Sequence, residues 1–590
     1  MKTRNQIENK FKWDLSSIIK DDQEIESIFR LMEQYLDAIP IYKGKLGNKD
    51  MLYSMLTNHQ DDEQRIYDLG YFLFNSLSVD SSDTRILKYI QRYEILSSKI
   101  SVASAYIQPE LYELSDEYLL SVLKDPRFTD YDNYINDIIK LKPHKLSEHD
   151  TTLLSKMGKF IDNNSNIHSL LTDSEMEFEN AIDSKGKAHP VNSATYSNLL
   201  HSKDRTLKKN AFNSMMSGFK SLNKTFASIY LNDIENDKFH AELKRYPDVL
   251  TEELFTNDIP RSVFDNIIKH TNNNIPTMNR FIKALKQYTG IKDFSYYDLF
   301  QKIDIGGKIS LERAHNMILT ALAPLGNEYL DLVKAKLNDQ SIDYLPNKNK
   351  NSGAYCSNCY GQKTVILMNY LYDFNSVDTL IHEMGHCINA EYFNSSQPRT
   401  KAEITIFAAE IASTVNEILL LDHCIKNAKG KEKIAYLYQL LDTVRSTIFR
   451  QVLFSEFELY AHQSIEQDKP ITYEDLNKYY YDLNKKYYGK ALKVPTLLQY
   501  EWERIPHFYN AYYVYSYATG LVTAICIAKK ILTDQDFSNQ YIRFLKNGTA
   551  KPAVEMLKEI GIDMTSDQPY RIAFDFIKEY VITFEKSVKN

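Results

Sequence analysis

The stretch TLIHEMGHCINAEY, residues 379–392, places two histidines four positions apart, with a glutamate directly after the first. On a helix, His382 and His386 are separated by about 40° around the axis, so both imidazoles project from one face. This spacing allows both rings to bind one Zn²⁺, with Glu383 beside the position of an activated water. The alternative is a chance match on a core helix. The pattern predicts a helix that carries a metal site.

A catalytic zinc site uses three protein ligands and a water, so we expect a third ligand elsewhere. One extended motif has a histidine six residues after the second, but Tyr392 stands at that position here. Glu391 lies on the same helix, about 140° around the axis from His386, and cannot reach the metal. The third ligand must therefore come from another element.

The next predicted helix, residues 402–421, carries Glu403, Glu410 and Glu417 at intervals of seven, so periodicity alone does not choose among them. Glu417 is followed by bulky residues, and we expect Glu403, near a loop, to be solvated or ion-paired. Small residues that would let this helix approach the first closely surround Glu410: Ala408, Ala409, Ala412 and Ser413. We predict Glu410 as the third ligand.

The segment GAYCSNCYGQKTVILMNY, residues 353–370, ends in a β-prone run and predicts a hairpin or short sheet directly before the histidine helix. An exposed edge of that sheet could pair with an extended peptide through main-chain hydrogen bonds. Cys356 and Cys359 form a single CxxC pair without partner ligands, and we expect two free thiols. Cys387, next to a predicted zinc ligand, suggests sensitivity to oxidation.

The composition predicts a soluble helical protein. A chain of 590 residues favours two lobes, and only 18 glycines and 16 prolines favour long helices. The net charge of −7 argues against binding to nucleic acid or anionic membranes. The polar N-terminus lacks a signal-peptide core, and the longest apolar stretch, residues 520–528, is too short to span a bilayer. With five cysteines, these features predict a cytoplasmic protein.

Apolar residues return every three or four positions over residues 206–234, which predicts one amphipathic helix. The polar segment DSKGKAHPVNS, residues 183–193, contains glycine and proline and is the best candidate for a boundary between lobes. We therefore expect an N-terminal helical lobe over residues 1–190 and a catalytic domain over residues 191–590.

The segment HFYNAYYVYSYATG, residues 507–520, contains one histidine and five tyrosines. A tyrosine-rich helix can be an aromatic core face. The functional interpretation is that a phenol and an imidazole donate hydrogen bonds to an oxyanion as it develops in a transition state.

HEMGH, followed 24 residues later by the glutamate of FAAEIASTVNE, resembles the oligoendopeptidase F family, relatives of thimet oligopeptidase. The resemblance covers essentially the whole chain. The further segments that fall in the family's order are KFKWDLS (10–16), LLHSKDRTLKKNAF (199–212), YYDLF (296–300), SGAY (352–355), HFYNAYYVYSYATG (507–520) and FLKNGTAKPAVEMLKEIGIDM (544–564).

The resemblance implies one Zn²⁺ per chain with His382, His386 and Glu410 as ligands, and Glu383 as general base. It implies a mostly α-helical, two-lobed body that encloses a deep channel, with a small β-sheet next to the zinc helix. It also assigns the other site residues: Gly353, Ala354 and Tyr355 bind substrate, Tyr515 donates to the oxyanion, His507 assists catalysis and contacts substrate, and Tyr513 contacts substrate. Among the tyrosines, Tyr509, Tyr512 and Tyr513 remain alternatives to Tyr515.

The predicted function is a cytoplasmic zinc endopeptidase that hydrolyses short unstructured peptides. One alternative is an exopeptidase of similar fold, which needs a fixed cation for a terminal carboxylate; Arg504 is the arginine adjacent to the tyrosine segment. Another is a catalytically silent peptide-binding scaffold, which predicts loss of Glu383, the third ligand or the tyrosines, and all are present. The sequence does not predict the oligomeric state or the cleavage preference.

Overall fold

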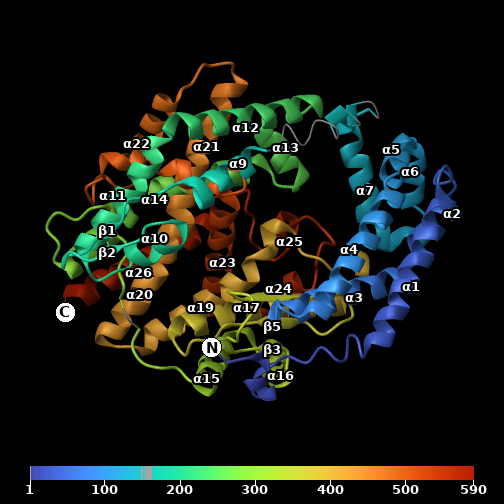
Figure 1. Ribbon diagram of the computed structural model, residues 1–590, viewed down its shortest axis with the longest axis horizontal. Helices are drawn as coiled ribbons and strands as arrows, with labels where there is room; N and C mark the ends of the chain where they lie inside the picture. Colours follow the sequence, from blue (N-terminus) through green and yellow to red (C-terminus); the bar gives the residue numbers. More distant parts are fainter. Residues whose placement is uncertain (1, 148–149, 152, 155–162, 304, 590) are drawn as a thin grey trace. The chain divides into compact units, whose positions relative to one another are not determined.

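The protein is described by a computed structural model covering residues 2–147, 150–151, 153–154, 163–303 and 305–589 (Figure 1). Helices dominate the described chain, and the strands are two or three residues long. The predicted mostly α-helical fold with a small sheet is confirmed. No helix in this part of the chain combines the length and apolar composition needed to cross a lipid bilayer.

The chain divides into two compact units, each assembled from three separate segments. The first unit contains residues 1–145, 307–420 and 530–556, and the second contains 146–306, 421–529 and 557–590. The sequence-based boundary at residue 190 lies inside the segment 146–306. There, residues 183–193 include β2 (Ala188–His189) of a short antiparallel pair with β1 (Ala181–Ile182).

The first unit begins with a run of helices that leads to a second helical group around a small sheet. Its α-helices are α1 (Asp22–Ala38), α2 (Lys49–Thr57), α3 (Gln60–Val79), α4 (Thr84–Ser104), α5 (Ile107–Glu113), α6 (Asp116–Leu123), α7 (Asp132–Leu141), α15 (Leu311–Ala321), α16 (Asn327–Asn338), α17 (Phe374–Ser396), α18 (Ile406–Ala409) and α24 (Phe537–Leu545). The division between units falls within α19 (Ile411–Asn427), α23 (Tyr515–Thr533) and α25 (Ala553–Glu559).

The second unit is built around long helices, of which α14 packs along α26. Its α-helices are α9 (Asn164–Leu170), α10 (Ser193–Leu200), α11 (Arg205–Ser221), α12 (Asn223–Leu243), α13 (Val249–Thr256), α14 (Arg261–Thr289), α20 (Gly430–Val444), α21 (Arg450–Glu466), α22 (Tyr473–Tyr488) and α26 (Gln568–Lys589). The single helix expected over residues 206–234 is divided at Leu222 into α11 and α12. The apolar repeat continues through this break, so periodicity did not reveal it.

A three-stranded sheet precedes the histidine helix, as the sequence predicted. Its order is β3 (Ile342–Asp343), β5 (Val365–Leu367), β4 (Tyr355–Ser357), with β5 parallel to β3 and antiparallel to β4. All three residues of β5 are buried, in keeping with the apolar run in the sequence. β4 lies at the edge of the sheet among the described strands.

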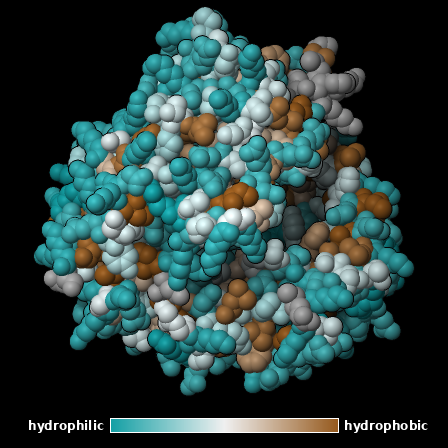
Figure 2. Space-filling view, turned by 60° about the vertical axis from the view of Figure 1, so that its left-hand side comes forward, coloured by the Kyte–Doolittle hydropathy of each residue, from teal (hydrophilic) through white to brown (hydrophobic). Residues whose placement is uncertain are grey.

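The core of the first unit joins this sheet to the N-terminal helices. Buried side chains of α1, α3 and α4, including Phe29, Leu73 and Ile90, belong to one apolar cluster with Val365 and Leu367 of β5. The N-terminal segment therefore supports the sheet next to the histidine helix. On the face drawn in Figure 2, hydrophilic residues predominate and apolar ones form small separate groups, as is usual for a protein surface in water.

Candidate metal centre

The histidine pair lies on α17, which begins after Asp373. The Oδ1 atom of Asp373 accepts a hydrogen bond from the Ser376 backbone N–H at 2.9 Å and so caps the helix. His382 and His386 project from one face, and their Nε2 atoms are 3.2 Å apart. The four-residue spacing thus brings both imidazoles together, as the helical period requires.

Glu410 is the carboxylate that the fold brings to the two histidines. It lies at the break between α18 and α19, where one continuous helix over 402–421 was expected. Its Oε2 atom is 3.4 Å from Nε2 of His382 and 3.5 Å from Nε2 of His386. The three residues form a group able to hold a metal ion, with ligand atoms within 4.8 Å of one another.

These three separations fit a tetrahedral cation. Zinc bonds of about 2.0–2.1 Å place two ligand atoms of a regular tetrahedron about 3.3–3.4 Å apart. The observed distances of 3.2, 3.4 and 3.5 Å agree with this value to within 0.2 Å. Two imidazoles and one carboxylate are also a donor set that zinc accepts in catalytic sites.

Glu417 contacts the opposite nitrogen of His382. Its Oε1 atom is 2.6 Å from Nδ1 of the ring. A hydrogen bond from Nδ1–H to this carboxylate would leave Nε2 unprotonated and able to bind a cation, and it would raise the basicity of the ring. Glu403, the third candidate, lines a different pocket. The three glutamates spaced seven residues apart therefore lie in three different environments.

Gly385 of α17 allows this helix to lie in close backbone contact with the start of α19. A Cβ atom added at this position would lie 2.5 Å from Cα of Ser413 and 2.7 Å from the carbonyl oxygen of Ala412. These are the small residues that the sequence placed beside Glu410. The distance between α17 and α19, and hence the position of Glu410, is set by this contact.

Glu383 lies beside the two histidines, and its side chain is mostly buried. Burial raises the pKa of its carboxyl group, while the charges of His382 and His386 and a hydrogen bond from the Cys356 backbone N–H act in the opposite direction. The carboxylate is therefore tied to β4 as well as to α17. This contact positions Glu383 next to the sheet edge.

The surrounding carboxylates create a site suited to positive charge. Burial alone would lower the pKa of His382, but the hydrogen bond that its ring donates to Glu417 and the charges of Glu417, Glu383 and Glu410 raise it to about 9. The hydrogen bond with His386 lowers the pKa of Glu410 to about 2. The same negative groups would attract a divalent cation in place of the proton.

A pocket of about 360 Å³ in the first unit contains the metal group and part of β4. Ala354, Tyr355 and Cys356 line it together with Glu383 and Glu410. Gly353 directly precedes this stretch, with a φ of 81° that favours glycine. The metal group, Glu383 and the predicted substrate segment are thus assembled in one place.

Comparison with known proteins identifies the family. The profile described as Peptidase family M3 matches residues 198–576, and the profile described as Oligopeptidase F matches residues 110–178. The chain belongs to peptidase family M3. The resemblance to oligoendopeptidase F predicted from the motifs is therefore confirmed, and the chain is a member of a peptidase family.

Relatives and solved structures extend this M3 likeness over nearly the whole chain. Oligopeptidase PepF of Bacillus subtilis is 32% identical and aligns over 99% of this chain and 88% of its own length. The structure of oligoendopeptidase-F from Enterococcus faecium is 28% identical, with a TM-score of 0.73 over 96% of this chain and 99% of its own. A Chlamydophila abortus structure is 31% identical, with a TM-score of 0.94 over 99% and 100%.

The cysteines near this M3 site are free thiols, as expected for the CxxC pair. A hydrogen bond between the thiols of Cys356 and Cys387, followed by burial, raises the pKa of Cys356 well above its usual value. Cys387 is fully buried. Burial restricts the access of oxidants to Cys387, and the predicted sensitivity to oxidation stays a prediction.

The tyrosine segment belongs to the second unit, where three of its side chains form an accessible cluster. The rings of His507 and Tyr513 are nearly parallel, with centroids 6.3 Å apart, and Tyr517 packs edge-on against both. The Tyr517 hydroxyl lies 3.4 Å from Nε2 of His507. Tyr517 was not among the tyrosines considered from the sequence, because the motif alone does not show which rings share an exposed face.

The other tyrosines of this segment are more enclosed. Tyr515 is buried and packs edge-on against Phe264. Tyr512 is buried in the left-handed region with φ of 52°, and its backbone N–H donates to Oε1 of Glu458 at 2.6 Å. Tyr509 packs on His168. The catalytic roles of His507, Tyr513 and Tyr515 stay predictions.

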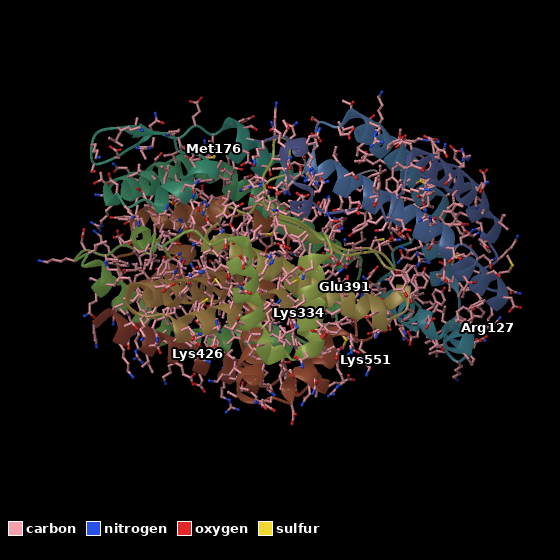
Figure 3. All side chains as sticks on the ribbon, turned by 90° about the horizontal axis from the view of Figure 1, so that it is seen from below. Arg127, Met176, Lys334, Glu391, Lys426 and Lys551 are labelled. Carbon is pink, nitrogen blue, oxygen red and sulfur yellow. The ribbon has the colours of Figure 1, made fainter. Side chains whose placement is uncertain are left out.

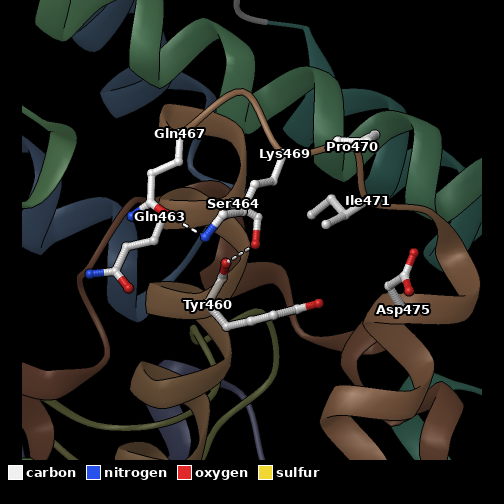
Figure 4. A pocket seen from close by; sticks show the side chains of 8 residues that line it. All are labelled: Tyr460, Gln463, Ser464, Gln467, Lys469, Pro470, Ile471 and Asp475. Atoms are coloured by element: carbon white, nitrogen blue, oxygen red, sulfur yellow. Dashed lines mark hydrogen bonds between the residues drawn. The ribbon is translucent and has the colours of Figure 1, made fainter.

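Among the described residues, Glu391 and a pocket of the second unit do not share the features of the metal centre. Glu391, labelled in Figure 3, pairs with Nζ of Lys336 at 2.8 Å. In the second unit, a pocket of about 300 Å³ is lined by polar and apolar side chains of α21, of the loop after it and of α22 (Figure 4). Its carboxylate, Asp475, accepts a hydrogen bond from the Thr472 backbone N–H and caps α22. The polar groups of this pocket therefore serve local structure.

Proposed function

We propose that the protein is a zinc-dependent endopeptidase that hydrolyses short unstructured peptides, with one Zn²⁺ per chain held by His382, His386 and Glu410. The tetrahedral separations of 3.2, 3.4 and 3.5 Å among the three ligand atoms carry this proposal. Membership of a peptidase family supports the reaction class.

Glu383 acts as the general base in this scheme. The bound zinc would supply a Lewis acid that polarises the scissile carbonyl and makes a water molecule more acidic. The Glu383 carboxylate accepts a proton from the attacking water and then delivers it to the leaving amine. Burial raises the pKa of this carboxyl group, which favours its alternation between the two protonation states.

The substrate pairs with β4 in an extended conformation. β4 is an edge strand in the described sheet, and Ala354 and Tyr355 line the metal pocket. The Tyr355 hydroxyl donates to Oδ1 of Asn75 at 3.0 Å, which fixes the strand against α3. Main-chain pairing binds peptides without requiring a particular sequence, and Gly353 leaves the backbone open for close approach.

The oxyanion donor is proposed to come from the tyrosine segment. The family resemblance assigns this role to Tyr515, with His507 assisting and Tyr513 contacting substrate. The cluster of exposed His507 with half-buried Tyr513 and Tyr517 supports a role for this segment in binding, since its polar groups are partly accessible. Arg504, the cation that the exopeptidase alternative needs, lies over the ring of Tyr196, 5.1 Å from its centroid.

Metal analysis of purified variants tests the ligand set. We expect about one zinc per wild-type chain and severe loss of zinc in Glu410→Ala. Glu403→Ala changes another of the three glutamates spaced seven residues apart. This variant is the matched control and should retain the metal. Full retention in Glu410→Ala would overturn the assignment.

Digestion of peptides blocked at both termini, followed by mass spectrometry, tests the endopeptidase mode. An endopeptidase cleaves an acetylated and amidated peptide internally, whereas an exopeptidase that grips a free terminus does not. A folded protein of similar composition serves as the second substrate and should remain intact. Equal turnover of peptide and folded protein would contradict the preference for unstructured chains.

A further inference from the structure

A second pocket of the first unit adjoins the metal pocket. It has a volume of about 500 Å³, and Asn358 lines both pockets. Its walls come from α3, from α4, from the loop after β4 and from residues 399–403. The metal, Glu383 and the predicted substrate segment do not account for this pocket.

The wall formed by α3 and α4 is aromatic and open. Tyr67 and Phe74 lie seven positions apart on one face of α3, and they are 59% and 45% exposed. Phe74 packs edge-on against Tyr93 of α4, with ring centroids 6.1 Å apart. Gly70 lies between them in sequence, and a Cβ atom there would be 2.5 Å from the Tyr93 hydroxyl oxygen. The glycine therefore lets the Tyr93 ring cover α3 and extend the aromatic wall.

The polar groups of this pocket favour an uncharged occupant. The guanidinium of Arg399 is paired with Glu63 and lies 5.8 Å from the centroid of the Tyr67 ring. Glu403 adds a further carboxylate. Burial raises the pKa of Cys359 to about 12, so its thiol remains neutral. An acidic side chain would meet Glu403 and find Arg399 already paired, whereas an aromatic ring would meet other rings.

β4 and the loop after it lead from one pocket to the other. Residues 354–356 line the metal pocket, and residues 358–360 line the aromatic pocket. Four residues of an extended substrate peptide span about 13 Å at about 3.3 Å per residue. A peptide paired with β4, and cleaved beside Glu383, would therefore reach the aromatic pocket with a side chain three or four residues from the cleaved bond.

We propose that the pocket formed by Tyr67, Phe74 and Tyr93 binds an aromatic side chain of the peptide substrate, three or four residues from the cleaved bond. This inference rests on the proposed function and adds a specificity site to it. The peptide is bound by its backbone at β4 and selected by one ring in this pocket.

A peptide series with Phe, Ala or Glu at each position around one fixed cleavage site tests the proposal. We expect one position, three or four residues from the bond, at which Phe gives about tenfold higher kcat/KM than Ala, with Glu poorest. Phe74→Ala should abolish this preference mainly through KM, because the ring contact is present before and during the reaction. Phe74→Leu, which keeps apolar bulk, should retain part of it.

Phe239→Ala removes a comparably exposed ring on α12 of the second unit, 44% exposed, and is the matched control. It should keep the full preference. The proposal would be overturned if the wild-type protein showed no preference for Phe at any position. It would also be overturned if Phe74→Ala kept the preference. Unfolding temperatures of all variants are compared so that a folding defect is not mistaken for lost selectivity.

A binding measurement separates this inference from the proposed function. The Glu383→Gln variant, loaded with zinc, is titrated with each Phe peptide of the series and with its Ala counterpart. We expect about tenfold tighter binding of one Phe peptide, lost when Phe74→Ala is added. If no peptide is cleaved by wild type but this Phe74-dependent binding persists, the proposed function fails and the aromatic site stands. Equal binding of the Phe and Ala peptides at every position refutes the aromatic site alone.

Discussion

The metal centre and the tyrosine segment 507–517 hold their polar side chains by different means. In the metal centre, His382 and His386 share one helical face, and Gly385 brings the backbone carrying Glu410 against that helix. In the tyrosine segment, the chain passes through short helical turns and the left-handed Tyr512 before α23 begins. Regular helices convert sequence spacing directly into geometry, whereas an irregular segment does not.

The largest effect is expected at Glu383, which tests the chemistry of the metal centre. Glu383→Gln should retain about one zinc per chain but lower kcat by about 10²–10⁴, the usual contribution of a general acid–base group. Steady-state kinetics and metal analysis of the same sample measure both quantities. Glu391→Gln, on the same helix, is the control and should leave both unchanged. A near-normal kcat in Glu383→Gln would exclude Glu383 as the general base.

The next effect distinguishes the rings of the tyrosine segment. Resemblance assigns the oxyanion donor to Tyr515, whereas accessibility favours Tyr513 or Tyr517, because a donor must present its hydroxyl to substrate. We expect Tyr513→Phe or Tyr517→Phe to lower kcat and kcat/KM together by about 10²–10³. Tyr515→Phe should keep most activity if its ring serves packing. Loss in Tyr515→Phe alone would restore the assignment from resemblance, and no loss in any variant would exclude the segment as donor.

A smaller effect is expected at Glu417, which acts through His382. Glu417→Ala removes the acceptor of Nδ1–H and should weaken zinc binding by about 10–100-fold, as is typical for such partners of metal ligands. Glu417→Gln keeps an oxygen acceptor and should recover part of the affinity. Competition with a zinc chelator measures the constants. Unchanged affinity in Glu417→Ala would mean that packing alone orients the ring.

The smallest effect concerns helix packing at Gly385. Gly385→Ala places a methyl group against the Ser413 backbone and should lower the free energy of unfolding by about 1–3 kcal/mol. Gly520→Ala is the matched control, because this helical glycine has no neighbouring atom within 4 Å of an added Cβ. There, alanine should be neutral or stabilising. Chemical denaturation compares the two, and equal effects would argue against close backbone packing at Gly385.

The sequence predicted the parts of the site that depend on short-range spacing. The four-residue interval placed His382 and His386 on one face, and the small residues near Glu410 pointed to close packing. It did not predict the interruption of the helix at Glu410, because one non-helical residue barely disturbs the apolar period. The aromatic pocket on α3 arises from contacts between distant segments, which local patterns do not encode.

The backbone contact at Gly385 has a consequence for metal exchange. Because protein packing sets the distance between α17 and α19, the proposed metal cage would be formed by folding itself and not by the cation. Treatment with a chelator should then yield a folded apoprotein, unlike the small zinc domains that unfold when stripped of metal. Such an apoprotein could be refilled with Co²⁺, whose visible absorption would report directly on the coordination of His382, His386 and Glu410.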